Sequence, residues 1–121
     1  MSGDWTNSGE TMVEQFLKEM IEKFNAKAAA EPAFEKEMQG MKKVVQIDVT
    51  DGEKYFFTLE NARIGPMSKG SVSNPDIAVA GSTETFMKLK SGELRPMKAY
   101  ALRKLQVKGT LEDILKLRKF F

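Results

Sequence analysis

The feature that most constrains the fold is a pair of alternating segments on either side of Asp51-Gly52. Residues 43–50 carry Val or Ile at every second position, and residues 54–59 do the same with Tyr, Phe and Leu. A period of two is typical of strands with one buried face, and Asp-Gly between two such runs favours a tight hairpin. The expected buried face consists of Val45, Ile47, Val49, Tyr55, Phe57 and Leu59. The chain is therefore predicted to contain an antiparallel sheet.

A helical periodicity precedes this hairpin. Between residues 11 and 30 apolar side chains recur at spacings of three and four, which predicts one long amphipathic helix. Pro32 ends it and suits the first turn of a short helix to Met38. The other expected elements are strands over 62–67, 77–80 and 105–107, and helices over 83–90, 97–102 and from 110 onward. This pattern predicts an α+β fold, in which helices pack on one face of a mainly antiparallel sheet of about five strands.

The length of 121 residues predicts a single domain over residues 1–121, because two cores of half this size are near the lower limit for folding. Residues 1–10 are polar, so we expect them to be flexible and not to form a signal peptide. No apolar run reaches the roughly 18 residues that a membrane span needs. With no targeting motif at the C-terminus, the expected location is the cytoplasm.

The chain has no cysteine and no histidine. Disulfides, thiolate or imidazole metal sites, and Cys or His nucleophile pairs are therefore excluded. No phosphate loop or calcium loop has the required spacing, and the neighbouring carboxylates lie on expected helix surfaces. We therefore expect no cofactor, no metal and no enzymatic activity.

Charge is distributed unevenly along the chain. Residues 1–85 carry 9 Lys or Arg and 14 Asp or Glu, a net charge of −5, whereas residues 86–121 carry 10 and 3, a net charge of +7. A basic C-terminal third favours an anionic partner, such as a phospholipid surface or a phosphate-bearing ligand. The alternative is a solvated surface whose charge the acidic part balances across the fold. Nucleic acid is not expected, because the sequence carries no recognisable binding motif.

The C-terminal half also contains short motifs in a fixed order. They are Asn74-Pro75-Asp76-Ile77-Ala78-Val79, Phe86-Met87-Lys88-Leu89, Ser91-Gly92-Glu93-Leu94-Arg95-Pro96, Ala99-Tyr100 and Lys104-Leu105-Gln106-Val107-Lys108-Gly109, followed by an apolar helix. Over residues 74–117 this order resembles the sterol carrier protein type 2 domain, a lipid-binding and lipid-transfer family. The part before residue 74 agrees with that family in architecture only. Arg103 departs from the pattern, because it stands where members of the family usually have glycine.

The resemblance implies that the sheet and helices enclose an apolar tunnel for fatty acids, fatty acyl-coenzyme A, phospholipids or sterols. Such a lining removes an acyl chain from water at about 0.8 kcal/mol per methylene. The residues expected to line the tunnel are Phe16, Met20, Phe24, Phe57, Leu59, Phe86, Met87, Leu89, Leu94, Met97, Tyr100, Leu102 and Leu115. For each of these residues, packing in the core is the alternative to ligand contact.

The expected function is non-catalytic binding and transfer or presentation of a lipid. The alternative is a protein-interaction module that uses the same groove for an apolar segment of a partner. The residues expected to contact a membrane or a lipid head group are Lys108, Lys116, Arg118, Lys119, Phe120 and Phe121. The expected partners are a lipid or fatty acyl ligand and an anionic membrane surface, and the expected state is a monomer or weak dimer.

Overall fold

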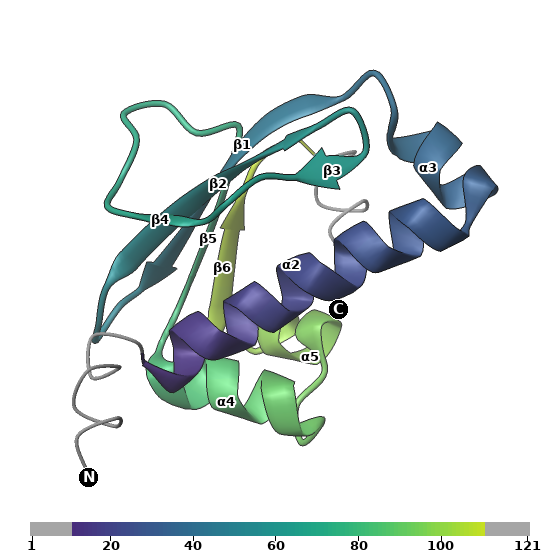
Figure 1. The fold of residues 1–121 in the computed structure, drawn as a ribbon. Helices are drawn as coiled ribbons and strands as arrows, with labels where there is room; N and C mark the ends of the chain where they lie inside the picture. Colours follow the sequence, from purple (N-terminus) through teal and green to yellow (C-terminus); the bar gives the residue numbers. More distant parts are fainter. Residues whose placement is uncertain (1–10, 111–121) are drawn as a thin grey trace, which may run out of the picture.

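The computed structural model describes residues 11–110, and Figure 1 shows how the elements are arranged. The elements are helices α2 (Met12–Ala30) and α3 (Pro32–Met38), strands β1 (Lys42–Val49), β2 (Lys54–Glu60), β3 (Arg63–Ile64), β4 (Ser68–Lys69) and β5 (Ile77–Gly81), helices α4 (Thr83–Ser91) and α5 (Pro96–Ala101), and strand β6 (Leu105–Lys108). Residues 1–10 and the expected C-terminal helix lie outside the described part. None of the helices within residues 11–110 is long and apolar enough to span a membrane.

The strands form one mixed sheet in the order β3-β2-β1-β5-β6, with β4 paired to β2. Neighbouring strands are antiparallel except β1 and β5, which run parallel from the pair Val45 and Ile77 to the pair Val49 and Gly81. This arrangement confirms the predicted α+β class and the mainly antiparallel sheet. Hairpin signals between consecutive strands carry no information about the parallel pair, which brings the second half of the chain beside the first.

The predicted hairpin is present, but its connection is wider than a two-residue turn. The paired register ends at Asp48 and Lys54, and the loop closes through a hydrogen bond from Val49 N to Glu53 O of 3.1 Å. A two-residue turn of the favoured type needs positive φ at both central residues, and neither Asp51 nor Gly52 has one. Instead, the Asp51 side chain extends to Thr83 at the start of α4.

A two-residue turn of that favoured type occurs between β2 and β3 instead. Asn61 and Ala62 have φ values of 53° and 63° there, and Ala62 is fully buried. The short strand beyond the turn is held by a helix side chain. Asn25 of α2 donates to Ile64 O at 2.9 Å and accepts from Ile64 N at 2.8 Å. The amide therefore satisfies both backbone groups of a residue that, among the strands of residues 11–110, lies at the sheet edge.

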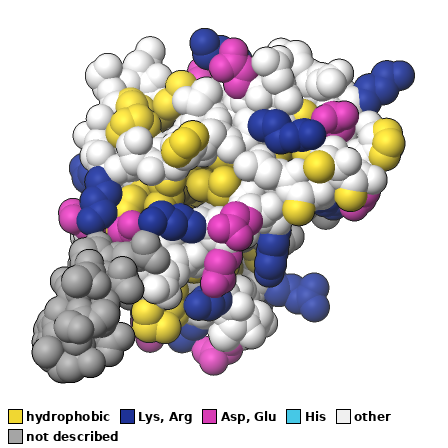
Figure 2. Space-filling view, viewed as in Figure 1, with side chains coloured by type: hydrophobic (Ala, Val, Ile, Leu, Met, Phe, Trp, Pro, Cys, Tyr) yellow, Lys and Arg dark blue, Asp and Glu magenta, His cyan; other side chains and the backbone are white. Residues whose placement is uncertain are grey.

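The core lies between the sheet and the helices. Helices α2, α4 and α5 are on one side of the sheet in Figure 1. The predicted hairpin face is buried there, and the other buried hydrophobic residues include Val13, Leu17, Phe24, Phe34, Met38, Ile64, Ile77, Val79, Phe86 and Leu105. Figure 2 shows hydrophobic side chains still visible where α2 passes the edge of the sheet, with charged side chains around them. The apolar core therefore reaches the surface beside α2.

The first turn of α2 is joined to the sheet by a buried carboxylate. Glu14 is only 7% exposed, and its oxygens lie 3.3 Å from Lys18 Nζ and 3.8 Å from Lys69 Nζ. The Tyr55 hydroxyl donates to Glu14 Oε1 at 3.4 Å. The charge is thus paired on both sides, as burial of a carboxylate requires.

Candidate functional site

A pocket of about 710 Å³ lies between α2 and the connection from α4 to α5. Its volume falls within the range of small-molecule sites, about 300 to 1,000 Å³. The lining residues are Phe16, Met20, Lys23, Leu89, Lys90, Gly92, Leu94, Arg95, Pro96 and Met97. The pocket therefore joins an apolar lining to three basic side chains.

The α2 side of the pocket follows from helical spacing. Phe16, Met20 and Lys23 are four and three residues apart, so they share one face of α2. Phe16 is buried, Met20 is partly buried and Lys23 is exposed, so the lining changes from apolar to charged along the helix. Methionine is flexible and polarisable, and it can adapt its shape to an apolar ligand.

The opposite side is built by the end of α4. Ser82 caps the start of this helix by accepting from Thr85 N at 3.1 Å, and Gly92 ends it with a left-handed φ of 81°. Beyond that glycine, Leu94 N donates to Lys88 O at 3.1 Å, which turns the chain back beside the helix. Leu89 and Leu94, both partly buried, are thus brought together on the pocket.

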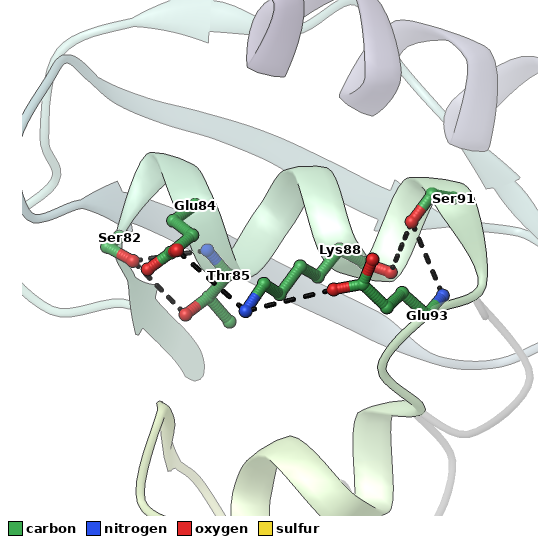
Figure 3. Close-up of polar contacts among 6 residues, drawn as sticks. All are labelled: Ser82, Glu84, Thr85, Lys88, Ser91 and Glu93. Atoms are coloured by element: carbon green, nitrogen blue, oxygen red, sulfur yellow. Dashed lines mark hydrogen bonds and ion pairs between the residues drawn. The ribbon is translucent and has the colours of Figure 1, made fainter.

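The basic residues of the pocket differ from the lysine beside them. Lys88 is paired with Glu84 and Glu93, each at 3.8 Å, as Figure 3 shows. Within residues 11–110, no carboxylate lies within 4.0 Å of the side chains of Lys23, Lys90 or Arg95, and all three residues are exposed. We refer to Lys23, Lys90 and Arg95 as the basic rim. Its charge is not neutralised by acidic neighbours in the described part of the chain.

The structure brings only part of the predicted lining together. The predicted residues that line this pocket are Phe16, Met20, Leu89, Leu94 and Met97. Phe24, Phe57, Leu59 and Phe86 lie in the core instead, each at most 5% exposed. Phe24 packs edge to face on Phe34 of α3, with ring centroids 5.2 Å apart. Ligand contact by these four residues stays a prediction.

Other predicted residues lie away from the pocket lining or outside the described part. Met87 is partly buried against the core, whereas Tyr100, Leu102 and Lys108 are exposed. The predicted contacts outside residues 11–110 are Leu115, Lys116, Arg118, Lys119, Phe120 and Phe121. Their roles stay predictions.

The basic rim, Gly92 and Pro96 were not among the predicted site residues. Two signals pointed to them. Lys23 lies seven residues after Phe16, two helical turns along the same face, and Arg95-Pro96 ends one of the motifs shared with the family. Within residues 11–110, no group of three or more Asp or Glu side chains is placed to hold a metal ion.

The position that departs from the family pattern has the backbone of a glycine. Arg103 has a φ of 61°, in the left-handed region, where the chain turns from α5 into β6. Arg103 N donates to Tyr100 O at 3.0 Å, and Lys104 N donates to Ala99 O at 2.9 Å. The turn is thus kept with an arginine in it, at the cost of local strain.

Solved structures of low sequence identity share this fold. The palmitated form of SCP2L2 from Aedes aegypti is 21% identical, with a TM-score of 0.58 over 83% of this chain and 88% of that one. The sec-alkylsulfatase from Pseudomonas sp. is 15% identical, with a TM-score of 0.57 over 72% of this chain but 14% of that one. The fold therefore occurs both as a free domain and as part of a longer chain.

Sequence comparison gives a family. Hydroxysteroid dehydrogenase-like protein 2 of Rattus norvegicus is 34% identical over 70 residues, which are 57% of this chain. The match spans only 13% of that relative's length. Residues 17–121, which are most of the chain, match the SCP-2 sterol transfer family. Together with the fold, this match shows that the chain belongs to the SCP-2 sterol transfer family.

Proposed function

We propose that this chain binds a lipid with a long acyl chain in the pocket between α2 and the α4–α5 connection, and that it transfers or presents the lipid without chemical change. The observation that carries the proposal is a pocket whose lining is apolar on both walls and basic at the residues of the rim. A palmitated relative with the same fold supports an acyl ligand.

The expected driving force is removal of the acyl chain from water. Each buried methylene contributes about 0.8 kcal/mol, so a chain of a dozen methylenes offers roughly 10 kcal/mol. The loss of translational and rotational freedom on binding costs about 4 to 15 kcal/mol, which is comparable to this gain. The net affinity therefore depends on how completely Phe16, Met20, Leu89 and Leu94 surround the chain.

The basic rim favours a ligand with a negative head group. Lys23, Lys90 and Arg95 carry charge without an acidic partner in the described part, so an anionic carboxylate or phosphate gains favourable electrostatic energy there. A neutral ligand gains none of this energy. We therefore expect fatty acids, fatty acyl-coenzyme A and anionic phospholipids to bind more tightly than neutral lipids of the same chain length.

Isothermal titration calorimetry with palmitate tests the acyl pocket. Leu94→Asp places a carboxylate against the bound chain and is expected to weaken binding at least tenfold, because a charge is costly to bury. Met12→Asp is the matched control, since Met12 is 62% exposed and does not line the pocket. Equal affinity of both variants would contradict the proposed pocket.

Two further measurements test the head group and the absence of chemistry. The double variant with Lys23→Gln and Arg95→Gln is expected to bind palmitate more weakly than the wild type but to bind hexadecanol, which has no charge, with unchanged affinity. Palmitoyl-coenzyme A incubated with the protein is expected to be recovered intact by mass spectrometry. Release of free coenzyme A thiol would show catalysis and overturn the non-catalytic part of the proposal.

A further inference from the structure

In the described part of the chain, most of the exposed large hydrophobic residues lie in or next to α5. Within residues 11–110, the exposed large hydrophobic residues are Met12, Met97, Tyr100 and Leu102. Three of these four are in or directly after α5, and each of the three is 42% to 51% exposed. Such clustering distinguishes α5 from the rest of the surface formed by residues 11–110, where a single exposed hydrophobic residue needs no explanation.

The stretch of chain that carries this cluster is basic. From Leu94 to Thr110 the sequence contains no Asp or Glu. The basic residues of that stretch, all exposed, are Arg95, Lys98, Arg103, Lys104 and Lys108. Lys108 lies at the far end of β6, paired with Ala78, whereas the other four lie in or directly beside α5. We call Arg95, Lys98, Arg103 and Lys104, with Met97, Tyr100 and Leu102, the α5 surface.

The backbone holds the α5 surface together. Ala99 is fully buried and holds α5 on the core, whereas Met97, Lys98, Tyr100 and Ala101 of this short helix are exposed. Met97 and Tyr100 are three residues apart and share one side of the helix. The turn after α5 folds back through the hydrogen bond from Lys104 N to Ala99 O of 2.9 Å, which keeps Arg103 and Lys104 next to the end of α5.

We propose that the α5 surface docks this protein on an anionic phospholipid bilayer. Exposed apolar side chains among cations match the boundary between acyl chains and negative head groups, where apolar burial and electrostatic attraction act together. The absence of acidic side chains between residues 94 and 110 favours a surface of uniform negative charge. A protein partner usually presents charges of both signs, so its binding would not require a stretch without acidic side chains.

The α5 surface is continuous with the pocket. Arg95 and Met97 belong to both, so a bilayer that contacts α5 lies beside the pocket lining. Docking itself does not need a filled pocket. The consequence for transfer, that a lipid passes between bilayer and pocket at this edge, rests on the proposed function.

Sedimentation with vesicles tests the docking. The full chain is mixed with phosphatidylcholine vesicles that contain either no phosphatidylserine or 30 mol% of it, at low and at high salt. We expect binding only to the phosphatidylserine vesicles, with affinity that falls as salt rises. Lys98→Glu combined with Lys104→Glu is expected to weaken this binding at least about tenfold. Lys36→Glu, a single change at an exposed position in α3, is the charge control and should leave binding nearly unchanged.

The apolar part of the surface has its own pair of variants. Tyr100→Ser combined with Leu102→Ser is expected to weaken vesicle binding severalfold, whereas Met12→Ser, which removes a more exposed side chain elsewhere, is expected to leave it unchanged. Thermal melting establishes that each variant is folded. Reduced binding by the α5 variants alone would support the proposal.

Other outcomes would overturn it. They are no binding of the wild-type chain to anionic vesicles, equal loss in the control variants, or self-association that disappears in the Tyr100 and Leu102 variant, which would make this face a contact between copies of the chain. Palmitate affinity of the Lys98 and Lys104 variant, measured without vesicles, separates the two proposals. If this variant binds palmitate normally but no longer binds vesicles, the result supports docking by the α5 surface. If the wild-type chain does not bind palmitate, the result contradicts the proposed pocket and leaves the docking proposal standing.

Discussion

Asp51, in the loop between β1 and β2, accepts two hydrogen bonds from Thr83, the first residue of α4: one from Thr83 N at 2.8 Å and one from Thr83 Oγ1 at 2.9 Å. The contact joins residues that are 32 positions apart. It also supplies a negative charge to the start of α4, where unpaired N–H groups favour one. The hairpin loop thereby fixes the helix that forms one wall of the pocket.

This contact predicts a pH dependence of stability. The hydrogen bonds from the backbone and the side chain of Thr83 lower the pKa of Asp51 below its ordinary value of 3.8. A carboxyl whose pKa is lower in the folded state contributes stability above its unfolded pKa, and this contribution is lost as pH falls through the folded pKa. Urea unfolding should therefore show Asp51→Asn less stable than wild type at pH 7, with a smaller difference at pH 3. A difference that is the same at both pH values would contradict this.

The two hydrogen bonds between the Asn25 amide and the backbone of Ile64, at the sheet edge, are expected to stabilise the fold. Removal of the amide leaves Ile64 N and Ile64 O without their partner in the structure, so Asn25→Ala is expected to lower the free energy of unfolding by about 1 to 2 kcal/mol. Gln15→Ala, at an exposed position on the same helix, serves as the control. The urea midpoints of the two variants provide the comparison. If both variants lose equally, the edge contact contributes nothing specific.

The left-handed backbone at Arg103 predicts that glycine is more stable than alanine at this position. Its φ of 61° strains a residue with a Cβ by about 1 to 2 kcal/mol, and glycine adopts this conformation without that strain. We expect Arg103→Gly to be about 1 kcal/mol more stable than Arg103→Ala, which removes the long side chain but keeps the Cβ. Thermal unfolding of the two variants measures this difference. A more stable alanine variant would contradict the left-handed turn.

The parts of the fold that follow from local periodicity were predictable from the sequence. The apolar stripe of α2 and the buried face of Val45, Ile47 and Val49 are confirmed. They could be predicted because burial on one side imposes a period of 3.6 residues on a helix and of 2 on a strand. The parallel pairing of β1 with β5 was not predictable in this way. It depends on contacts between segments more than 30 residues apart, which leave no local signal.

The site was less predictable than the fold for a related reason. Phe16 and Phe24 lie on one apolar stripe of α2, yet Phe16 lines the pocket and Phe24 packs on Phe34. The stripe identifies the buried side of a helix but does not distinguish core from cavity. Lys23 lines the pocket because the α4–α5 connection lies opposite α2, and that connection depends on the left-handed turn at Gly92.

The most direct test of the proposed pocket is methyl NMR of the methionines with a bound fatty acid that carries a nitroxide on its acyl chain. Met20 and Met97 line the pocket, whereas Met38, in α3, is buried in the core and does not line it. The account predicts that stoichiometric ligand broadens the Met20 and Met97 methyl signals strongly and the Met38 signal much less, and that excess unlabelled palmitate restores them. Broadening of Met38 with sharp signals from Met20 and Met97 would place the ligand elsewhere and contradict the account.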